Sequence, residues 1–410
     1  MTVIDRFLNY VRIPTPSDPH AGEETYPSNP EELVLLSTLK AELEALGLTA
    51  EMDEYGYVTA TLPANVEGAP TLGLIAHVDT SPAVSGRGVQ PRIIRYTGGD
   101  VLLDEGGQYR IAEVENPELA RYVGEELIVT DGSTLLGADD KAGVAEIMAT
   151  LDRLVSDPAL PHGKIRVAFT PDEEIGRGTD FFNVKAFDAD FGYTVDGGEL
   201  GEIEYENFNA AAGELVIEGV SVHPGSAKGK MKNAVDIFAD FHAGLPRAER
   251  PDATEGYEGF YMVDEVSGGV EALRASYIIR DHDREKLEKK KEFFLALAKQ
   301  IDEAWGGGCI TATVKDSYYN MAEIVARHPH LIENAKAAMQ ACGVTPKVIP
   351  IRGGTDGARL SYEGLPCPNL STGGLNFHGR QEYIPVKSLE TMVDVLVKLV
   401  GLYATKGKDA

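Results

Sequence analysis

Two adjacent carboxylates, Asp139 and Asp140, lie in the turn Leu135–Gly143, between an apolar run and a helix-forming segment. Like charges on neighbouring residues are costly unless a cation or several hydrogen-bond donors neutralise them. Many Asp-Asp pairs are simply solvated loop residues. The pair by itself therefore leaves both a metal site and an ordinary surface turn open.

The other imidazoles and carboxylates that could ligate a metal ion lie far away along the chain: His77, Glu174, Asp196 and His378. Such ligands without thiolates favour a catalytic zinc site, with cobalt or manganese as substitutes. Together with Asp139 they could hold two ions if one carboxylate bridges, and two ions would activate a shared water for hydrolysis. Each residue also has an ordinary explanation in a turn or at the surface, so spacing alone leaves the metal site undecided.

Predicted strands position these residues. The strands expected before residue 200 are Tyr57–Leu62, Thr71–Ala76, Leu127–Thr130, Lys164–Thr170 and Phe191–Val195. The second is almost wholly apolar, which is typical of a buried central strand, and His77 and Asp79 beyond it point to the same face. Strands that alternate with helices predict an α/β fold, with a mostly parallel sheet and helices on both faces. In such sheets, ligands bind beyond the carboxyl ends of the strands.

Two helices are expected around this sheet before residue 200. Asn29 is predicted to cap the first, which runs to Leu46, and Glu32 is predicted to complete its capping box. The second is Ala142–Leu154, directly after the paired carboxylates. Gly86–Tyr122 has no firm period, and we expect a long connection with a few short strands or turns.

The pattern changes between residues 208 and 317. The elements expected there are the strand Gly213–Val222, the helix Asn233–Gly244, the strands Gly259–Val266 and Glu271–Arg280, the helix Asp283–Trp305 and the strand Cys309–Val314. The order β-α-β-β-α-β is that of a ferredoxin-like unit. We therefore expect a catalytic domain of residues 1–207 and 318–410, interrupted by an inserted α+β lid domain of residues 208–317.

Composition limits the class of protein. A chain of 410 residues exceeds what one core normally supports, so two domains are expected. A net charge of −27 argues against nucleic acid as a partner. No run of 18 apolar residues is present, so no membrane span is expected. The N-terminus does not resemble a signal peptide, and three unclustered cysteines suit a reducing cytoplasm.

Seven short segments resemble, in order, the motifs of the M20 metallopeptidases. These segments are Ala76–Pro82, Gly137–Gly143, Thr170–Gly176, Tyr193–Gly198, Ser221–Gly229, Arg352–Gly357 and Leu375–Gly379. The resemblance runs essentially from end to end. It is greatest to the members that remove the N-terminal residue from tripeptides, and the chain departs from the family at none of its functional positions.

The resemblance implies two zinc ions per subunit, with cobalt or manganese as substitutes. His77 and Asp196 would bind one ion, Glu174 and His378 the other, and Asp139 would bridge them. Asp79 would orient the His77 imidazole, and Glu173 would be the general base. The resemblance also implies a cis peptide bond between Asp139 and Asp140.

The same resemblance implies roles in substrate binding for three further residues. His223 would stabilise the developing oxyanion of a small peptide substrate, and Arg280 and Arg352 would hold the terminal carboxylate of the peptide. Without the resemblance, each is an ordinary turn or surface residue.

The implied activity is that of a zinc aminopeptidase on tripeptides. The alternatives are another M20-type amide hydrolase (a dipeptidase, carboxypeptidase or deacylase) and a non-catalytic peptide-binding protein. Glu173 beside Glu174 argues against the last, because a binder needs no base. A homodimer that forms through the inserted domain also stays open.

Overall fold

A computed structural model describes residues 1–22 and 24–406, and the chain divides into two compact units. Unit 1 contains Met1–Tyr205, Glu323–Ile349 and Thr355–Ala410. Unit 2 contains Glu206–Ala322 and the short segment Pro350–Gly354, which the sequence pattern did not assign to it. Among the described residues, no helix is long and apolar enough to cross a membrane.

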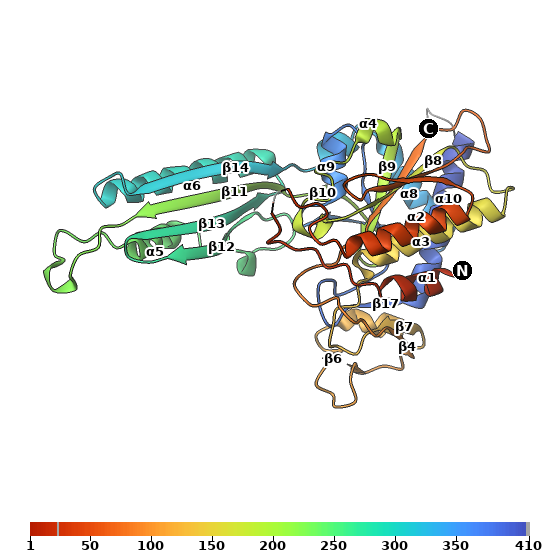
Figure 1. The fold of residues 1–410 in the computed structure, drawn as a ribbon, viewed down its shortest axis with the longest axis horizontal. Helices are drawn as coiled ribbons and strands as arrows, with labels where there is room; N and C mark the ends of the chain where they lie inside the picture. Colours follow the sequence, from red (N-terminus) through yellow and green to blue (C-terminus); the bar gives the residue numbers. More distant parts are fainter. Residues whose placement is uncertain (23, 407–410) are drawn as a thin grey trace. The chain divides into compact units, whose positions relative to one another are not determined.

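An eight-stranded sheet in the order β1-β2-β8-β3-β9-β16-β10-β15 forms the centre of unit 1 (Figure 1). Its strands are β1 (Thr49–Met52), β2 (Val58–Leu62), β3 (Leu72–His77), β8 (Ile165–Thr170), β9 (Phe191–Gly197), β10 (Glu202–Asn207), β15 (Lys347–Ile351) and β16 (Asn369–Ser371). The adjacent strands β8, β3, β9 and β16 are parallel. Strand β2 pairs antiparallel with β1 and β8, and β10 pairs antiparallel with β16. The prediction of a mostly parallel sheet is confirmed.

Helices cover both faces of this sheet, as predicted. The helices of unit 1 include α1 (Val3–Tyr10), α2 (Glu32–Ala45), α3 (Ala138–Ser156), α4 (Val184–Phe187), α8 (Pro329–Ala341), α9 (Asp356–Tyr362) and α10 (Val386–Lys406). Adjacent strand residues point to opposite faces. Tyr193 of β9 hydrogen-bonds Leu331 of α8 and Tyr403 of α10, whereas its neighbour Thr194 faces Gly357 of α9. Helix α3 packs against α10, β3 and β9.

The capping box predicted for helix α2 is wrong. Helix α2 begins at Glu32 and has no side-chain cap. Asn29 instead accepts a hydrogen bond from the backbone N–H of Glu31. The Glu32 side chain is buried, and its Oε2 accepts the N–H of Asp172 at 3.1 Å. A buried backbone N–H needs an acceptor. The Glu32 carboxylate therefore accepts the distant N–H of Asp172 and does not cap its own helix.

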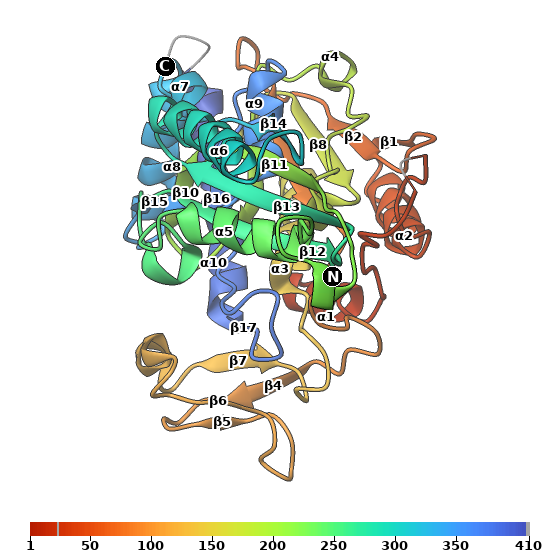
Figure 2. The same ribbon diagram turned by 90° about the vertical axis from the view of Figure 1, so that its left-hand side faces the viewer.

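A small three-stranded sheet in the order β17-β7-β4 also belongs to unit 1, and Figure 2 shows it at the bottom of the view. The elements of this region are β4 (Arg92–Arg95), β5 (Val101–Leu102), β6 (Arg110–Ile111), η1 (Pro117–Tyr122), β7 (Glu126–Val129) and β17 (Tyr383–Pro385). Most of them lie in the stretch predicted as a long connection with short strands. Strand β7 leads to the Asp139 turn, and β17 follows His378.

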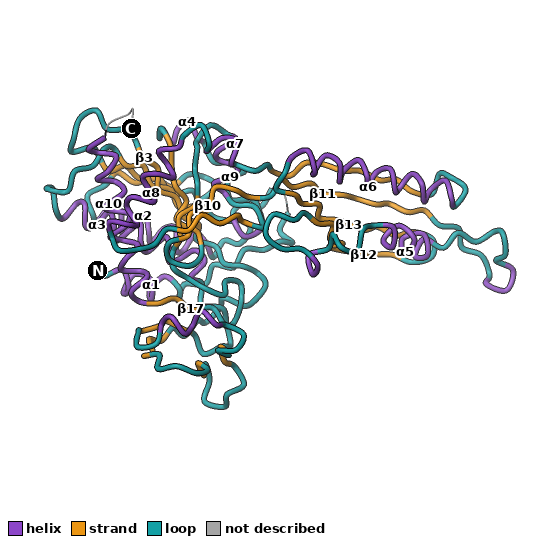
Figure 3. The backbone as a smooth tube through the Cα atoms, turned by 180° about the vertical axis from the view of Figure 1, so that it is seen from behind, coloured by secondary structure: helices purple, strands orange, loops and turns teal. Residues whose placement is uncertain are grey.

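Unit 2 is an antiparallel sheet in the order β12-β13-β11-β14, with helices α5 and α6 running along it (Figure 3). Its elements are β11 (Asn209–Glu218), η3 (Pro224–Ser226), α5 (Ala234–Gly244), η4 (Pro251–Ala253), β12 (Phe260–Gly268), β13 (Ala272–Asp281), α6 (Arg284–Ala304), β14 (Ile310–Tyr318) and the start of α7 (Ala322–Val325). Phe241 of α5 and Phe294 of α6 pack on Tyr277 of β13. This is the expected ferredoxin-like arrangement.

Candidate metal centre

The carboxyl edge of the parallel strands carries the predicted ligands. Strand β3 ends at His77, β8 leads into the short helix η2 (Glu173–Ile175), and Asp196 is the penultimate residue of β9. Asp139 lies at the start of α3, where its backbone is not helical and its peptide bond to Asp140 is cis, as the resemblance implied. His378 follows β16 and has a left-handed backbone, with φ 63°.

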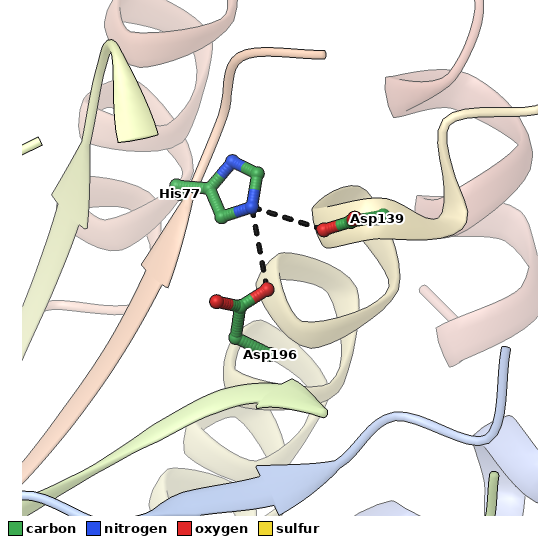
Figure 4. A group of neighbouring side chains, drawn as sticks. All are labelled: His77, Asp139 and Asp196. Carbon is green, nitrogen blue, oxygen red and sulfur yellow. Dashed lines mark hydrogen bonds and ion pairs between the residues drawn. The ribbon is translucent and has the colours of Figure 1, made fainter. Parts of the chain in front are cut away.

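One group of side chains gathers around His77 (Figure 4). Its Nε2 lies 3.0 Å from Oδ1 of Asp139 and 3.3 Å from Oδ1 of Asp196. The ligand atoms of these three residues all lie within 4.8 Å of one another. They could therefore surround one metal ion.

A second group gathers around His378. Its Nε2 lies 2.9 Å from Oδ2 of Asp139 and 2.9 Å from Oε2 of Glu174. These ligand atoms also lie within 4.8 Å of one another. The two carboxylate oxygens of Asp139 thus face different histidines, which is the geometry of a carboxylate that bridges two ions.

Electrostatics in the two groups favour added positive charge. Burial alone would lower the pKa of the His77 imidazole, but Asp196 and Asp139 raise it well above its ordinary value. The hydrogen bonds to Asp139 and Glu174 raise the pKa of His378 to about 11. Burial, together with Asp139, raises the pKa of Glu174 to about 8. Protons on the imidazoles and on Glu174 therefore offset the negative charge of the two groups, and metal cations could take the place of those protons.

Asp79 supports His77 from behind. Its Oδ1 lies 3.2 Å from Nδ1 of the imidazole and accepts the backbone N–H of Glu173 at 2.9 Å. Its Oδ2 accepts the N–H of Glu174 at 3.1 Å. One fully buried carboxylate therefore fixes the ring of His77 and the backbone of both glutamates.

Asp140 anchors backbone rather than facing the two groups. Its Oδ2 accepts the N–H of His77 at 3.1 Å, and its Oδ1 accepts the N–H of Gly143 at 3.2 Å. Both oxygens are therefore engaged within the protein. Asp140 thus binds backbone N–H groups, whereas the side chain of Asp139 faces the two histidines.

Glu173 has the environment of a proton acceptor. Burial raises the pKa of its carboxyl well above the ordinary value, and Asp196 adds to the rise. A base with a raised pKa takes up a proton more readily near neutral pH. Glu174, its neighbour, has its Oε2 within reach of His378.

The donor set fits a pair of zinc ions. Two imidazoles and three carboxylates without thiolates are ligands typical of catalytic zinc. Among the described residues, the buried Oε1 of Glu174 has no hydrogen-bond partner, which leaves one oxygen available to an ion. The ligand atoms of each group already lie close enough together to surround an ion.

The three residues predicted to bind substrate belong to unit 2. His223 is exposed, and its Nδ1 accepts the N–H of Gly225 at 3.1 Å. Nη1 of Arg280 donates to the carbonyls of Ala211 and Ile279. The guanidinium of Arg352 donates to two carbonyls and a hydroxyl, those of Gly256, Glu258 and Thr254. Their roles in substrate binding stay predictions.

Sequence reasoning missed Glu382, which contacts the turn that carries Asp139. The side chain is 1% exposed and accepts hydrogen bonds from three backbone N–H groups of that turn. The only local signal was an acid directly before the apolar strand Tyr383–Pro385.

A mostly parallel α/β sheet whose carboxyl edge carries two imidazole-carboxylate groups has the architecture expected of a metal-dependent hydrolase. Residues 130–401 match Peptidase family M20/M25/M40. A protein of Caldanaerobacter subterraneus named Peptidase T is 51% identical over 408 residues, which cover 99% of each chain. The present chain belongs to this peptidase family.

Solved structures agree on the fold. A tripeptidase from Staphylococcus aureus superposes with a TM-score of 0.78 at 23% identity, over 98% of each chain. The aminopeptidase PepT from Bacillus cereus gives a TM-score of 0.77 at 24% identity, also over 98% of each chain. At these identities the likeness concerns the fold alone.

Proposed function

We propose that the chain is a two-zinc aminopeptidase that releases the N-terminal residue from tripeptides. The observation that carries the proposal is the division of the Asp139 carboxylate between His77 and His378, at 3.0 and 2.9 Å. The names of the relatives, Peptidase T and tripeptidase, support the substrate class.

In this proposal His77 and Asp196 hold one zinc ion, Glu174 and His378 hold the other, and Asp139 bridges them. Bound there, two zinc ions would lower the pKa of a water molecule and polarise the peptide carbonyl. Cobalt or manganese would serve as substitutes, because the ligands are nitrogen and oxygen atoms.

The protein's own groups move the proton. Glu173 takes a proton from the attacking water and later delivers it to the leaving amine. Asp79 keeps Glu173 in place through its hydrogen bond to the backbone. Nδ1 of His223 accepts a hydrogen bond, so the neutral ring carries its proton on Nε2, which can donate to an oxyanion.

Arg280 and Arg352 are proposed to hold the carboxylate of the peptide. We also propose that two copies of the chain pair through unit 2, whose sheet ends in strands β12 and β14. Sedimentation of the purified protein tests that pairing. The cytoplasmic location stays a prediction.

The proposal is tested with four peptides and two metal states. Free tripeptides should be cleaved after their first residue, C-amidated tripeptides more slowly, and N-acylated tripeptides and dipeptides hardly at all. Dialysis against a strong chelator should abolish turnover, and zinc should restore it. Faster cleavage of the N-acylated peptide would favour a deacylase, release of the C-terminal residue a carboxypeptidase, and preference for a dipeptide a dipeptidase. Peptide binding without cleavage would indicate a binding protein.

A further inference from the structure

Glu382 is a buried carboxylate that the proposed chemistry does not use. It lies four residues after His378 and directly before strand β17, and its side chain is 1% exposed. A charged group at such depth is costly unless hydrogen-bond donors surround it. The hydrogen-bond donors to Glu382 are backbone N–H groups of the turn that carries Asp139.

Three hydrogen bonds join Glu382 to the turn at the start of α3. Its Oε2 accepts the N–H groups of Leu136 at 2.7 Å and Gly137 at 2.8 Å, and its Oε1 accepts the N–H of Asp139 at 3.1 Å. The first N–H groups of a helix have no partner within the helix. Gly137, at the N-cap of α3, has no side chain to satisfy them, so Glu382 supplies the acceptor from another part of the chain.

The segment that carries Glu382 also carries His378, and further contacts close this segment on itself and join it to the stretch of chain that precedes the turn. Nη1 of Arg380 donates to the carbonyl of Gly132 at 3.2 Å. Nδ2 of Asn376 donates to the carbonyl of Gln381 at 3.2 Å and so closes the loop around His378. Strand β17 pairs with β7, which precedes the turn. The segment that carries His378 and the segment that leads to Asp139 are therefore joined at several points.

We propose that Glu382 is a positioning residue of the metal centre, which fixes the bridging Asp139 relative to His378 by holding the backbone of the turn. The inference rests on the proposed two-metal function. Oε1 of Glu382 accepts the backbone N–H of Asp139 itself, and the Asp139 side chain reaches His378, which lies four residues before Glu382. Without this link, the Asp139 carboxylate loses its orientation toward the two ions.

The test compares Glu382→Gln with a matched variant, Asp302→Asn. Asp302 of unit 2 also accepts three backbone N–H groups, those of Gly308, Cys309 and Ile310 at 2.9, 2.7 and 2.9 Å. Both variants replace a carboxylate oxygen by an NH2 group that faces donors. Zinc titration of the metal-free protein, kcat and KM for a tripeptide, and the Tm of the metal-free protein are measured for each.

Glu382→Gln is expected to weaken zinc binding about 10- to 100-fold and to lower kcat by a similar factor, with little change in KM. Asp302→Asn should lower the Tm of the metal-free protein and leave zinc affinity unchanged. Equal losses of Tm with unchanged zinc affinity in both variants would overturn the inference, because Glu382 would then only stabilise the fold.

A second variant covers the case in which Glu382→Gln does not fold. Glu382→Asp keeps the charge but is one methylene shorter, and it should bind zinc more weakly than wild type; wild-type affinity would count against the inference. If the wild-type protein binds two zinc ions but does not cleave tripeptides, the substrate proposal fails while the zinc titrations still decide the role of Glu382. If it binds no zinc, both are overturned.

Discussion

Asp79 connects to the general-base candidate Glu173 through the backbone, since its Oδ1 accepts the N–H of Glu173 at 2.9 Å. The same oxygen lies 3.2 Å from Nδ1 of His77. A proposed metal ligand and the proposed base thus depend on one buried carboxylate. Their spacing is set by Asp79 rather than by either side chain alone.

Asp79→Asn should therefore impair metal binding and turnover together. An amide keeps the shape but weakens the bond to the imidazole and places an NH2 group against a backbone donor. We expect zinc affinity and kcat each to fall about 10- to 100-fold. Asp53→Asn is the control, because Asp53 also accepts two backbone N–H groups, those of Tyr55 and Tyr57, away from the centre. Equal effects of both variants on kcat would contradict the prediction.

Glu173→Gln and Glu174→Gln should have different consequences. Glu173→Gln should retain two zinc ions and lose about 10²- to 10⁴-fold in kcat, because only the proton acceptor is removed. Glu174→Gln should lose zinc, because Oε2 of Glu174 lies 2.9 Å from Nε2 of His378 within the second group. Metal analysis of both purified variants beside kcat checks this. Loss of zinc from Glu173→Gln would reject its assignment as a base.

The sequence predicted the edge of the sheet that carries the ligands, because the polar residues directly follow apolar strands. His77 after β3 and Asp196 near the end of β9 are local signals of this kind. Gly137–Gly143 also indicated a turn before a helix. Parallel strands then bring such ends together, so the gathering of the ligands follows from topology.

The supporting carboxylates could not be predicted in the same way. Glu382 binds the N–H of Gly137 across 245 residues of sequence, and Glu32 binds the N–H of Asp172 across 140. A local pattern contains no record of which distant backbone groups need acceptors. Glu32 therefore matched a capping box that the fold does not use.

Gly143→Ala should separate α3 from β9. A methyl group at position 143 would lie 1.8 Å from the carbonyl oxygen of Val195, the residue before Asp196. Helix and strand must move apart, at a cost of about 1–3 kcal/mol or more. Zinc affinity should fall too, because Asp139 lies in the first turn of α3. Chemical denaturation and zinc titration measure both effects.

Gly401→Ala is the matched control for that variant. Gly401 lies within α10, and outside its own stretch of helix the added methyl group would come no closer than 3.9 Å, to the carbonyl oxygen of Pro161. Removal of a helical glycine should stabilise the protein by about 0.5–1 kcal/mol. If alanine at both positions changed the free energy of unfolding in the same direction, the close approach of α3 to β9 would be unimportant for stability.

Arg352→Ala should destabilise unit 2. The guanidinium bonds Gly256, Glu258 and Thr254 and lies 5.1 Å from the ring centre of Phe208. We expect a loss of about 1–3 kcal/mol, measured by denaturation, whereas the exposed Arg274 should tolerate alanine within about 0.5 kcal/mol. A rise in KM confined to peptides with a free C-terminal carboxylate would support its role in substrate binding. An unchanged stability would show that these bonds contribute little.

Glu146 should make the stability of the protein depend on pH. Its side chain is fully buried in α3, and among the described residues neither carboxylate oxygen has a hydrogen-bond partner. Burial raises the pKa of Glu146 well above the ordinary 4.5. The folded state therefore keeps the proton at pH values where the unfolded state has released it. The favourable contribution of Glu146 to stability, which is fully present below pH 4.5, is lost as pH rises.

Glu146→Gln cannot titrate, so its stability relative to wild type should increase between pH 5 and pH 8, by at most about 1.4 kcal/mol per pH unit. Thr150→Val is the control. Thr150 lies in the same helix, and its buried hydroxyl also has no hydrogen-bond partner among the described residues. Its effect on the free energy of unfolding should not vary with pH. Urea denaturation of the three proteins at pH 5, 6, 7 and 8 measures the difference. A constant gap between Glu146→Gln and wild type would mean that Glu146 has the same pKa in the folded and unfolded states.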